Sequence, residues 1–136
     1  MAWGCKPPII IMARKHEEED SQKIIVAYCR QLHIPILGSA SGIYVSDIRT
    51  AMRFKALAII ADKGQPDLFI PVVKKDENGN VLFSGLMIEL KKKGGKATKE
   101  QLEWINYYNK NGYYARVIEG HDNAIELINN YINGSL

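Results

Sequence analysis

Two carboxylates and one lysine are spaced in this sequence so that they could hold a divalent cation beside a reacting group. Glu89 and Lys91 are separated by one residue, so on a β-strand their side chains would share a face. Asp67 opens an earlier apolar run directly after the turn-forming residues 64–66, where a strand is expected to begin. Mg²⁺ and Mn²⁺ prefer such oxygen ligands, and a nearby ammonium group can orient a water or offset charge growing on a phosphate. The pattern favours metal-dependent hydrolysis of a phosphodiester.

Each of these residues also has a purely structural explanation. Glu89 and Lys91 could form a solvated pair on an exposed strand, and Asp67 could simply cap a turn. A Glu-x-Lys triplet alone carries no weight, because it occurs by chance in many proteins. The chemical interpretation therefore requires elements that bring Asp67 and Glu89 together.

The pattern of apolar residues predicts helices and strands along the whole chain after a lead-in over residues 1–16. Residues 17–136 contain no linker and no internal repeat, which indicates one domain. The order of elements indicates an α/β fold, with a central mixed sheet of four or five strands flanked by helices. The expected helices cover residues 17–32, 47–61, 98–111 and 122–132, and the expected strands cover 34–37, 67–73, 81–91 and 113–119.

The region between the two acidic residues should form two neighbouring strands. Its first part is almost continuously apolar, which is typical of a strand buried on both faces, although Pro71 suggests an edge or a bulge. Asn78-Gly79 predicts a tight hairpin turn, and the return strand is expected to break near Ser84-Gly85. Ile88 and Leu90 would then fill the core, while the glutamate between them looks into a cleft and converges with the aspartate on one cation.

Two of the helices have clear start signals. Asp47 can cap the second helix, and Thr98 and Gln101 have the spacing of a capping box. The inner stripe of the second helix is expected to comprise Ile48, Met52, Ala56 and Ile59 or Ile60.

The composition is that of an ordinary globular domain. The chain has 136 residues and 46% hydrophobic content, and no apolar run approaches the roughly 20 residues that a membrane helix needs. The early apolar run over residues 9–12 is too short for a signal-peptide core, so a cytoplasmic location is expected. Cys5 and Cys29 form no CxxC pair and the histidines lie far apart, which argues against a structural zinc site.

The net charge of +3 is mild, and its distribution is more informative. Basic residues cluster at 91–99 and 49–55, whereas acidic residues cluster at 17–20. Such neighbouring patches suit a metal site beside a phosphate track, but many solvated surfaces also carry them. The residues expected to contact nucleic acid are the lysines Lys92, Lys93, Lys96 and Lys99 and the loop serines Ser39 and Ser41.

Three motifs in a fixed order resemble those of the PD-(D/E)XK nuclease superfamily, and more narrowly of its virus-type replication-repair nuclease (VRR-NUC) family. The motifs are Gly64-Gln65-Pro66-Asp67-Leu68, Glu89-Leu90-Lys91 and Thr98-Lys99-Glu100-Gln101, and the resemblance covers roughly residues 17–132. It implies a restriction-endonuclease-like core. It also implies that Asp67, Glu89 and the Leu90 carbonyl bind the metal, and that Lys91 is the catalytic lysine.

Two further assignments come from the resemblance and stay open. The family carries a glutamate on the first helix, and here the helical stripe favours Glu18, with Glu19 second, as a residue serving the metal. The family's glutamine would correspond to Gln101, which would hold Lys91 or a water. A capping box with Thr98 explains Gln101 equally well.

The resemblance also implies an activity. The expected protein is a Mg²⁺- or Mn²⁺-dependent deoxyribonuclease that cuts branched or structured DNA (flaps, forks or Holliday junctions) in phage replication, recombination or repair, in the host cytoplasm. A homodimer is expected, because one small domain offers little surface for a branched duplex. Two alternatives remain open: a non-catalytic nucleic-acid-binding module of the same fold, and an adaptor that uses the basic loop to contact an acidic partner.

Overall fold

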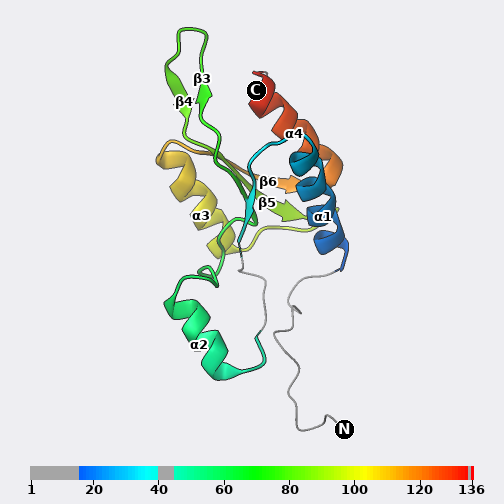
Figure 1. The fold of residues 1–136 in the computed structure, drawn as a ribbon, viewed down its shortest axis with the longest axis vertical. Coiled ribbons are helices and arrows are strands. Elements are labelled where there is room, and N and C mark those ends of the chain that lie inside the picture. The colour runs from blue at the N-terminus through cyan, green and yellow to red at the C-terminus, as the bar shows by residue number, and fades with distance from the viewer. Residues whose placement is uncertain (1–15, 40–44, 135) are drawn as a thin grey trace.

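The computed structural model describes residues 16–39, 45–134 and 136, which form a mixed sheet with helices on both faces and a separate hairpin (Figure 1). None of the described helices is long and apolar enough to cross a membrane. Along the chain the elements are α1 (His16–Gln31), β1 (Leu37–Gly38), α2 (Ile48–Ala56), β2 (Leu68–Ile70), β3 (Lys74–Lys75), β4 (Val81–Phe83), β5 (Leu86–Lys91), α3 (Lys99–Lys110), β6 (Tyr114–Glu119) and α4 (His121–Asn133).

The central sheet has four strands in the order β1-β2-β5-β6. β2 pairs antiparallel with both β1 and β5, whereas β5 and β6 pair parallel because α3 carries the chain back between them. α1 and α4 pack together on one face of the sheet, and α3 packs on the other (Figure 1). The predicted α/β fold with a central mixed sheet is therefore confirmed.

β5 separates two apolar layers through the alternation of its side chains. Ile88 and Leu90 are fully buried in the larger core, which includes residues of α1 and α4. Met87 points to the opposite face and packs in a smaller cluster with α3. Because side chains two residues apart share a face, Glu89 and Lys91 also lie on the α3 side of the sheet.

The chain between β2 and β5 forms the predicted hairpin. β2 ends at Ile70, so the strand expected over 67–73 is shorter than predicted, since the following Pro71 cannot donate to a ladder. β3 and β4 pair as a separate two-stranded sheet, and Gly79 in their turn has a φ of 84°, which glycine adopts without strain. Ser84-Gly85 separates β4 from β5, as expected.

α2 differs most from the prediction. It ends at Ala56 and not near residue 61, because Ala58 adopts a left-handed φ of 57° just beyond it. None of its residues is buried: Ile48 and Met52 are 73% and 67% exposed, and Ile59 beyond the helix is 51% exposed. The prediction of an inner stripe is wrong, because α2 projects away from the sheet and its apolar face stays uncovered within the described residues (Figure 1).

Candidate active site

Asp67 and Glu89 lie opposite each other on neighbouring strands. Leu68 pairs with Ile88 in the antiparallel ladder, so one step further along the same register brings Asp67 opposite Glu89. The Asp67 Oδ2 atom accepts a hydrogen bond from the Leu90 backbone N–H at 2.8 Å. The two carboxylates therefore meet where β2 begins, on the face of the sheet that α3 covers.

Both carboxylates are buried. Glu89 is 2% exposed and Asp67 is 7% exposed, and the neighbouring Lys91 side chain is 13% exposed. The turn after β5 folds back toward the site, since a Cβ on Gly95 would lie 3.5 Å from the Lys91 Cβ. The prediction that Glu89 faces an open cleft is therefore wrong for the described residues. The two acids form a polar pair in the interior.

The electrostatic environment of Glu89 is strongly perturbed. Burial, and then the negative charge of Asp67, raise the pKa of Glu89 to about 8, while Lys91 acts in the opposite direction. The Lys91 Nζ lies 3.5 Å from the Glu89 Oε2. With both acids ionised, one ammonium group cannot balance two negative charges. A strongly shifted acid with a defined charge partner is typical of a functional site.

The atoms of the pair fit a divalent cation. The Glu89 Oε1 atom is buried without a hydrogen-bond partner, an unfavourable state that a cation would relieve. The N–H and C=O of one strand residue point to the same side, so the Leu90 carbonyl lies on the edge of β5 from which its N–H reaches Asp67. Two carboxylates and a carbonyl suit Mg²⁺ or Mn²⁺. Among the described residues, no group of three His, Cys, Asp or Glu side chains is arranged to hold a metal.

The two candidate glutamates of α1 lie in different surroundings. Glu19 forms a pair with Lys23 at 3.7 Å, and the Lys23 side chain is well exposed. Glu18 lies seven residues before the fully buried Ile25, on the stripe that packs against the sheet. Placement therefore favours Glu18 over Glu19, while a metal-binding role for either residue stays a prediction.

Gln22 is a neighbour of the site that sequence reasoning missed. A Cβ on Gly38 would lie 3.3 Å from the Gln22 Nε2 and 3.8 Å from the Asp67 carbonyl oxygen. The same carbonyl accepts a hydrogen bond from the Ser39 backbone N–H at 2.9 Å. Gln22 follows Glu18 by four residues and so shares its helical stripe, and this spacing is the signal that could have identified it.

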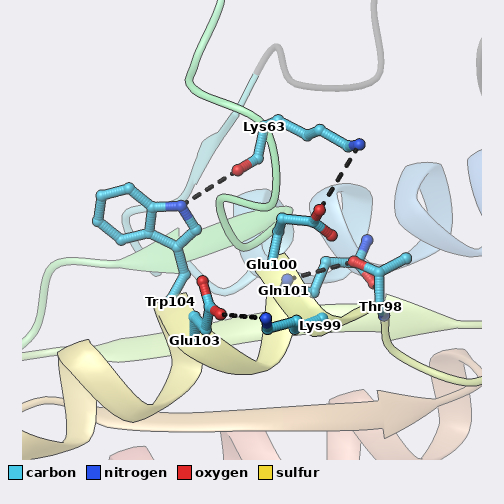
Figure 2. Close-up of polar contacts among 7 residues, drawn as sticks. All are labelled: Lys63, Thr98, Lys99, Glu100, Gln101, Glu103 and Trp104. Atoms are coloured by element: carbon cyan, nitrogen blue, oxygen red, sulfur yellow. Dashed lines mark hydrogen bonds and ion pairs between the residues drawn. The ribbon is translucent and has the colours of Figure 1, made fainter.

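Gln101 takes part in a capping box at the start of α3 (Figure 2). Its Oε1 accepts a hydrogen bond from the Thr98 N–H at 2.8 Å, and its own N–H donates to the Thr98 Oγ1 at 3.2 Å. The structure thus shows the capping role that the sequence left open. A role for Gln101 in holding Lys91 or a water stays a prediction.

The predicted nucleic-acid contacts follow β5 along the loop toward α3. Lys92 and Lys93 line a hollow of about 420 Å³ that also includes residues from the starts of α1 and α4. Lys96 and Lys99 are exposed. Ser41, the second predicted loop serine, lies outside the residues that the structure describes.

Comparison with known proteins points to one family. A family model described as "VRR-NUC domain" matches residues 44–122, which is more than half of the chain. A solved structure titled "VRR_NUC domain protein" is similar to this chain with a TM-score of 0.66 and 28% sequence identity. That similarity covers 88% of this chain and 91% of the other. No curated protein matches this chain.

Proposed function

Because the chain belongs to the VRR-NUC domain family, a family of nucleases that act on DNA, we propose that it hydrolyses DNA phosphodiester bonds with the help of Mg²⁺ or Mn²⁺. The observation that carries the proposal is the buried pair of Asp67 and Glu89 with Lys91 beside it. Two interior carboxyl groups are costly when both are ionised, and this cost falls when a divalent cation shares them, so a structural role alone explains the pair poorly.

In the proposed mechanism the chain supplies ligands and a positive charge in fixed positions. Asp67, Glu89 and the Leu90 carbonyl hold the cation, which when bound supplies Lewis-acid activation of the scissile phosphate and the attacking water. The Leu90 N–H holds one oxygen of Asp67 in place. The Lys91 ammonium orients the water and offsets negative charge that grows on the phosphate.

Three further residues are proposed to assist. Glu18, or Glu19 as the second choice, would serve a second metal position from α1. Gln101 would hold a water through its amide nitrogen, or the Lys91 ammonium through the second lone pair of its carbonyl oxygen, which already caps α3. The role of Gln101 rests on the resemblance and on its place in α3, which covers the face that carries the carboxylates. The role of Glu18 or Glu19 rests on the resemblance, because α1 packs on the opposite face of the sheet.

The basic loop after β5 is proposed to follow the DNA backbone. It begins directly at Lys91, so phosphates beside the scissile one would pass along it. Each lysine contact would add affinity that falls as the salt concentration rises. The proposed contacts are Lys92, Lys93, Lys96, Lys99, Ser39 and Ser41.

The proposed substrate is branched or structured DNA, and the proposed enzyme is a homodimer. A flap, fork or Holliday junction presents several duplex arms, and two copies of a small domain would contact more of them than one. The resemblance to phage-encoded members suggests a role in phage replication, recombination or repair, in the host cytoplasm. A panel of linear, flap, fork and four-way-junction DNAs would identify the preferred substrate.

The exposed apolar face of α2 supports the homodimer. A helix of 9 residues is marginal on its own in water, and exposing large apolar side chains makes it less favourable still. α2 also carries Arg49, Arg53 and Lys55 and no acidic residue, whereas α1 begins with the acidic residues 17–20. We therefore propose that α2 docks against a second copy of this chain, near the acidic start of its α1.

A plasmid-nicking assay with Mg²⁺ or Mn²⁺, and with EDTA, tests the proposed nuclease. The parent protein should nick only with metal, and Asp67→Ala, Glu89→Ala and Lys91→Ala should each abolish nicking. Matched controls on the exposed hairpin, Glu77→Ala and Lys75→Ala, should cut like the parent. Metal-independent DNA binding without any cleavage would favour the non-catalytic module. If all three site variants cut like the parent, the assigned site is wrong.

A further inference from the structure

The segment that leads into Asp67 is attached to one side of α3. Glu100, Trp104 and Tyr108 are spaced four residues apart, so they lie on the same side of the helix. Between them they approach all three of the consecutive residues 63–65. This helical face therefore holds a continuous piece of backbone that ends immediately before the site.

Lys63 is held to α3 at two points (Figure 2). The Trp104 Nε1–H donates a hydrogen bond to the Lys63 carbonyl oxygen at 3.1 Å. The Lys63 Nζ lies 3.8 Å from the Glu100 Oε1, but the two side chains are 83% and 46% exposed, so solvent screens this pair. The indole bond is also exposed, but it reaches the backbone itself and not the end of a flexible side chain, so it fixes the path of the chain more directly.

Gly64 and Gln65 continue the attachment toward Asp67. A Cβ on Gly64 would lie 2.8 Å from the Glu100 carbonyl carbon, and the φ of Gly64 is 90°, so only glycine allows the chain to approach α3 this closely. The Tyr108 hydroxyl donates to the Gln65 Oε1 at 2.7 Å. The Tyr108 ring centroid lies 5.9 Å from that of Trp104, so the two contacts form one connected surface.

The position of Asp67 depends on this attachment because the strand after it is short. β2 begins only at Leu68 and has three residues, so the ladder alone gives limited restraint at its first end. The Asp67 carboxylate must meet both the Leu90 N–H and the opposite Glu89. We propose that Trp104 is a positioning residue that fixes residues 63–66 on α3 and thereby places the Asp67 carboxylate opposite Glu89. The effect of this positioning role on metal binding rests on the function proposed above.

Trp104→Phe tests this role, because it keeps an aromatic ring and removes the N–H donor. Amide hydrogen exchange should become faster at Leu90, whose N–H reports the Asp67 bond, and should stay unchanged at Ile88 in the same strand. Mn²⁺ affinity, measured by calorimetry, should fall by up to about tenfold, the lower end of the loss for a direct partner of a metal ligand, because Trp104 acts on Asp67 only through residues 63–66. Tyr107→Phe, on the same helix but 53% exposed, is the matched control and should leave both readouts unchanged.

The outcomes separate the positioning role from the nuclease proposal. Unchanged Leu90 exchange and Mn²⁺ affinity in Trp104→Phe would overturn the positioning role even if the parent binds metal and cuts DNA. Equally faster exchange at Leu90 and Ile88 would indicate general destabilisation and would also overturn it. A parent that binds no Mn²⁺ contradicts the nuclease proposal, and the Leu90 exchange then decides the positioning role alone. Should Trp104→Phe not fold, Tyr108→Phe removes one hydroxyl and should change Leu90 exchange in the same direction.

Discussion

At the residue scale, Glu89 holds its proton far more tightly than an exposed glutamate does. Its pKa is raised from 4.5 to about 8, first by burial and then by the charge of Asp67. In the unfolded chain the same carboxyl ionises near its ordinary value. Between these two pH values the folded protein keeps a proton that the unfolded chain releases. The contribution of Glu89 to the free energy of unfolding should therefore fall as the pH rises through this window.

Glu89→Gln should remove this pH dependence, because the amide keeps the neutral shape and cannot ionise. Urea unfolding in EDTA at about pH 5 and about pH 8 measures the effect. The parent should lose more stability between these conditions than the variant loses. Glu77→Gln, on the exposed hairpin, serves as the control and should behave like the parent. Equal losses in the parent and in Glu89→Gln would contradict the assigned environment of Glu89.

Lys91 is expected to serve catalysis more than metal binding. Lys91→Met should lower the rate of DNA cleavage by about 100-fold or more, because it removes a charge aimed at the growing negative charge on the phosphate. Mn²⁺ affinity should be unchanged or higher, because an ammonium group 3.5 Å from Glu89 competes with a cation. Single-turnover cleavage and calorimetry measure the two effects. Loss of Mn²⁺ binding in Lys91→Met, with the fold intact, would show that the two functions are not separable in this way.

The sequence predicted the site residues' relative placement better than their surroundings. Side chains alternate along any strand, so the shared face of Glu89 and Lys91 followed from spacing alone. The hairpin then made Asp67 the neighbour of Glu89. The burial of the pair depends on the turn at Gly95 and on the packing of α3, which are long-range features that no local pattern encodes.

At the element scale, the β3–β4 hairpin is tied to the end of α4 by a buried lysine. The Lys74 Nζ donates to the Tyr131 carbonyl oxygen at 2.9 Å, and the Tyr131 hydroxyl donates to the Val72 carbonyl oxygen at 2.6 Å. A cation near the last turn of a helix also interacts favourably with the helix dipole. Lys74 is 9% exposed, so its bond to the backbone is shielded from water.

Lys74→Met should lower the free energy of unfolding by about 1–3 kcal/mol, because it leaves a buried carbonyl without its charged donor. Lys75→Met, at the exposed neighbouring position, should change it by no more than about 0.5 kcal/mol. Urea unfolding of both variants beside the parent gives the comparison. Similar stabilities for Lys74→Met and Lys75→Met would show that the tie contributes little.

The existence of most elements was predictable, and the exceptions have identifiable causes. The capping box at Thr98 is a local signal, and α3 begins directly after it. The turn at Gly79 is another, and it lies between the paired strands β3 and β4. α2 ends early because Ala58 adopts a left-handed conformation, which alanine ordinarily disfavours and which no sequence pattern indicates. Its apolar stripe resembled that of a core helix, because periodicity alone cannot identify what covers a helix.

At the scale of the whole molecule, the exposed face of α2 leads to a prediction about assembly. Met52→Glu should convert the proposed homodimer into a monomer, because it places a charge in the apolar stripe that the second copy would cover. Analytical ultracentrifugation at micromolar concentration measures the change. Val81→Glu, at an exposed apolar position on the hairpin, is the matched control and should remain dimeric. A parent protein that is purely monomeric, or a dimeric Met52→Glu, would remove α2 as the interface.

The sequence allowed the architecture of one copy to be predicted, but not its assembly. The order of helices and strands was enough to predict a mixed sheet flanked by helices, because the parallel strands β5 and β6 need a crossover such as α3 between them. The interface of a dimer could not be predicted from the sequence, because apolar residues that form an interface have the same pattern as apolar residues that form a core. α2 is the clearest example of this ambiguity.

Calorimetric titration of Mn²⁺ into the parent protein, Asp67→Asn and Glu89→Gln tests the central claim most directly, because it measures the cation and not the reaction. We expect the parent to bind Mn²⁺ and each variant to bind at least about tenfold more weakly, since each removes a charged ligand while preserving shape. Glu77→Gln should bind like the parent. A parent that binds no Mn²⁺, or site variants that bind it as tightly as the parent, would contradict the account.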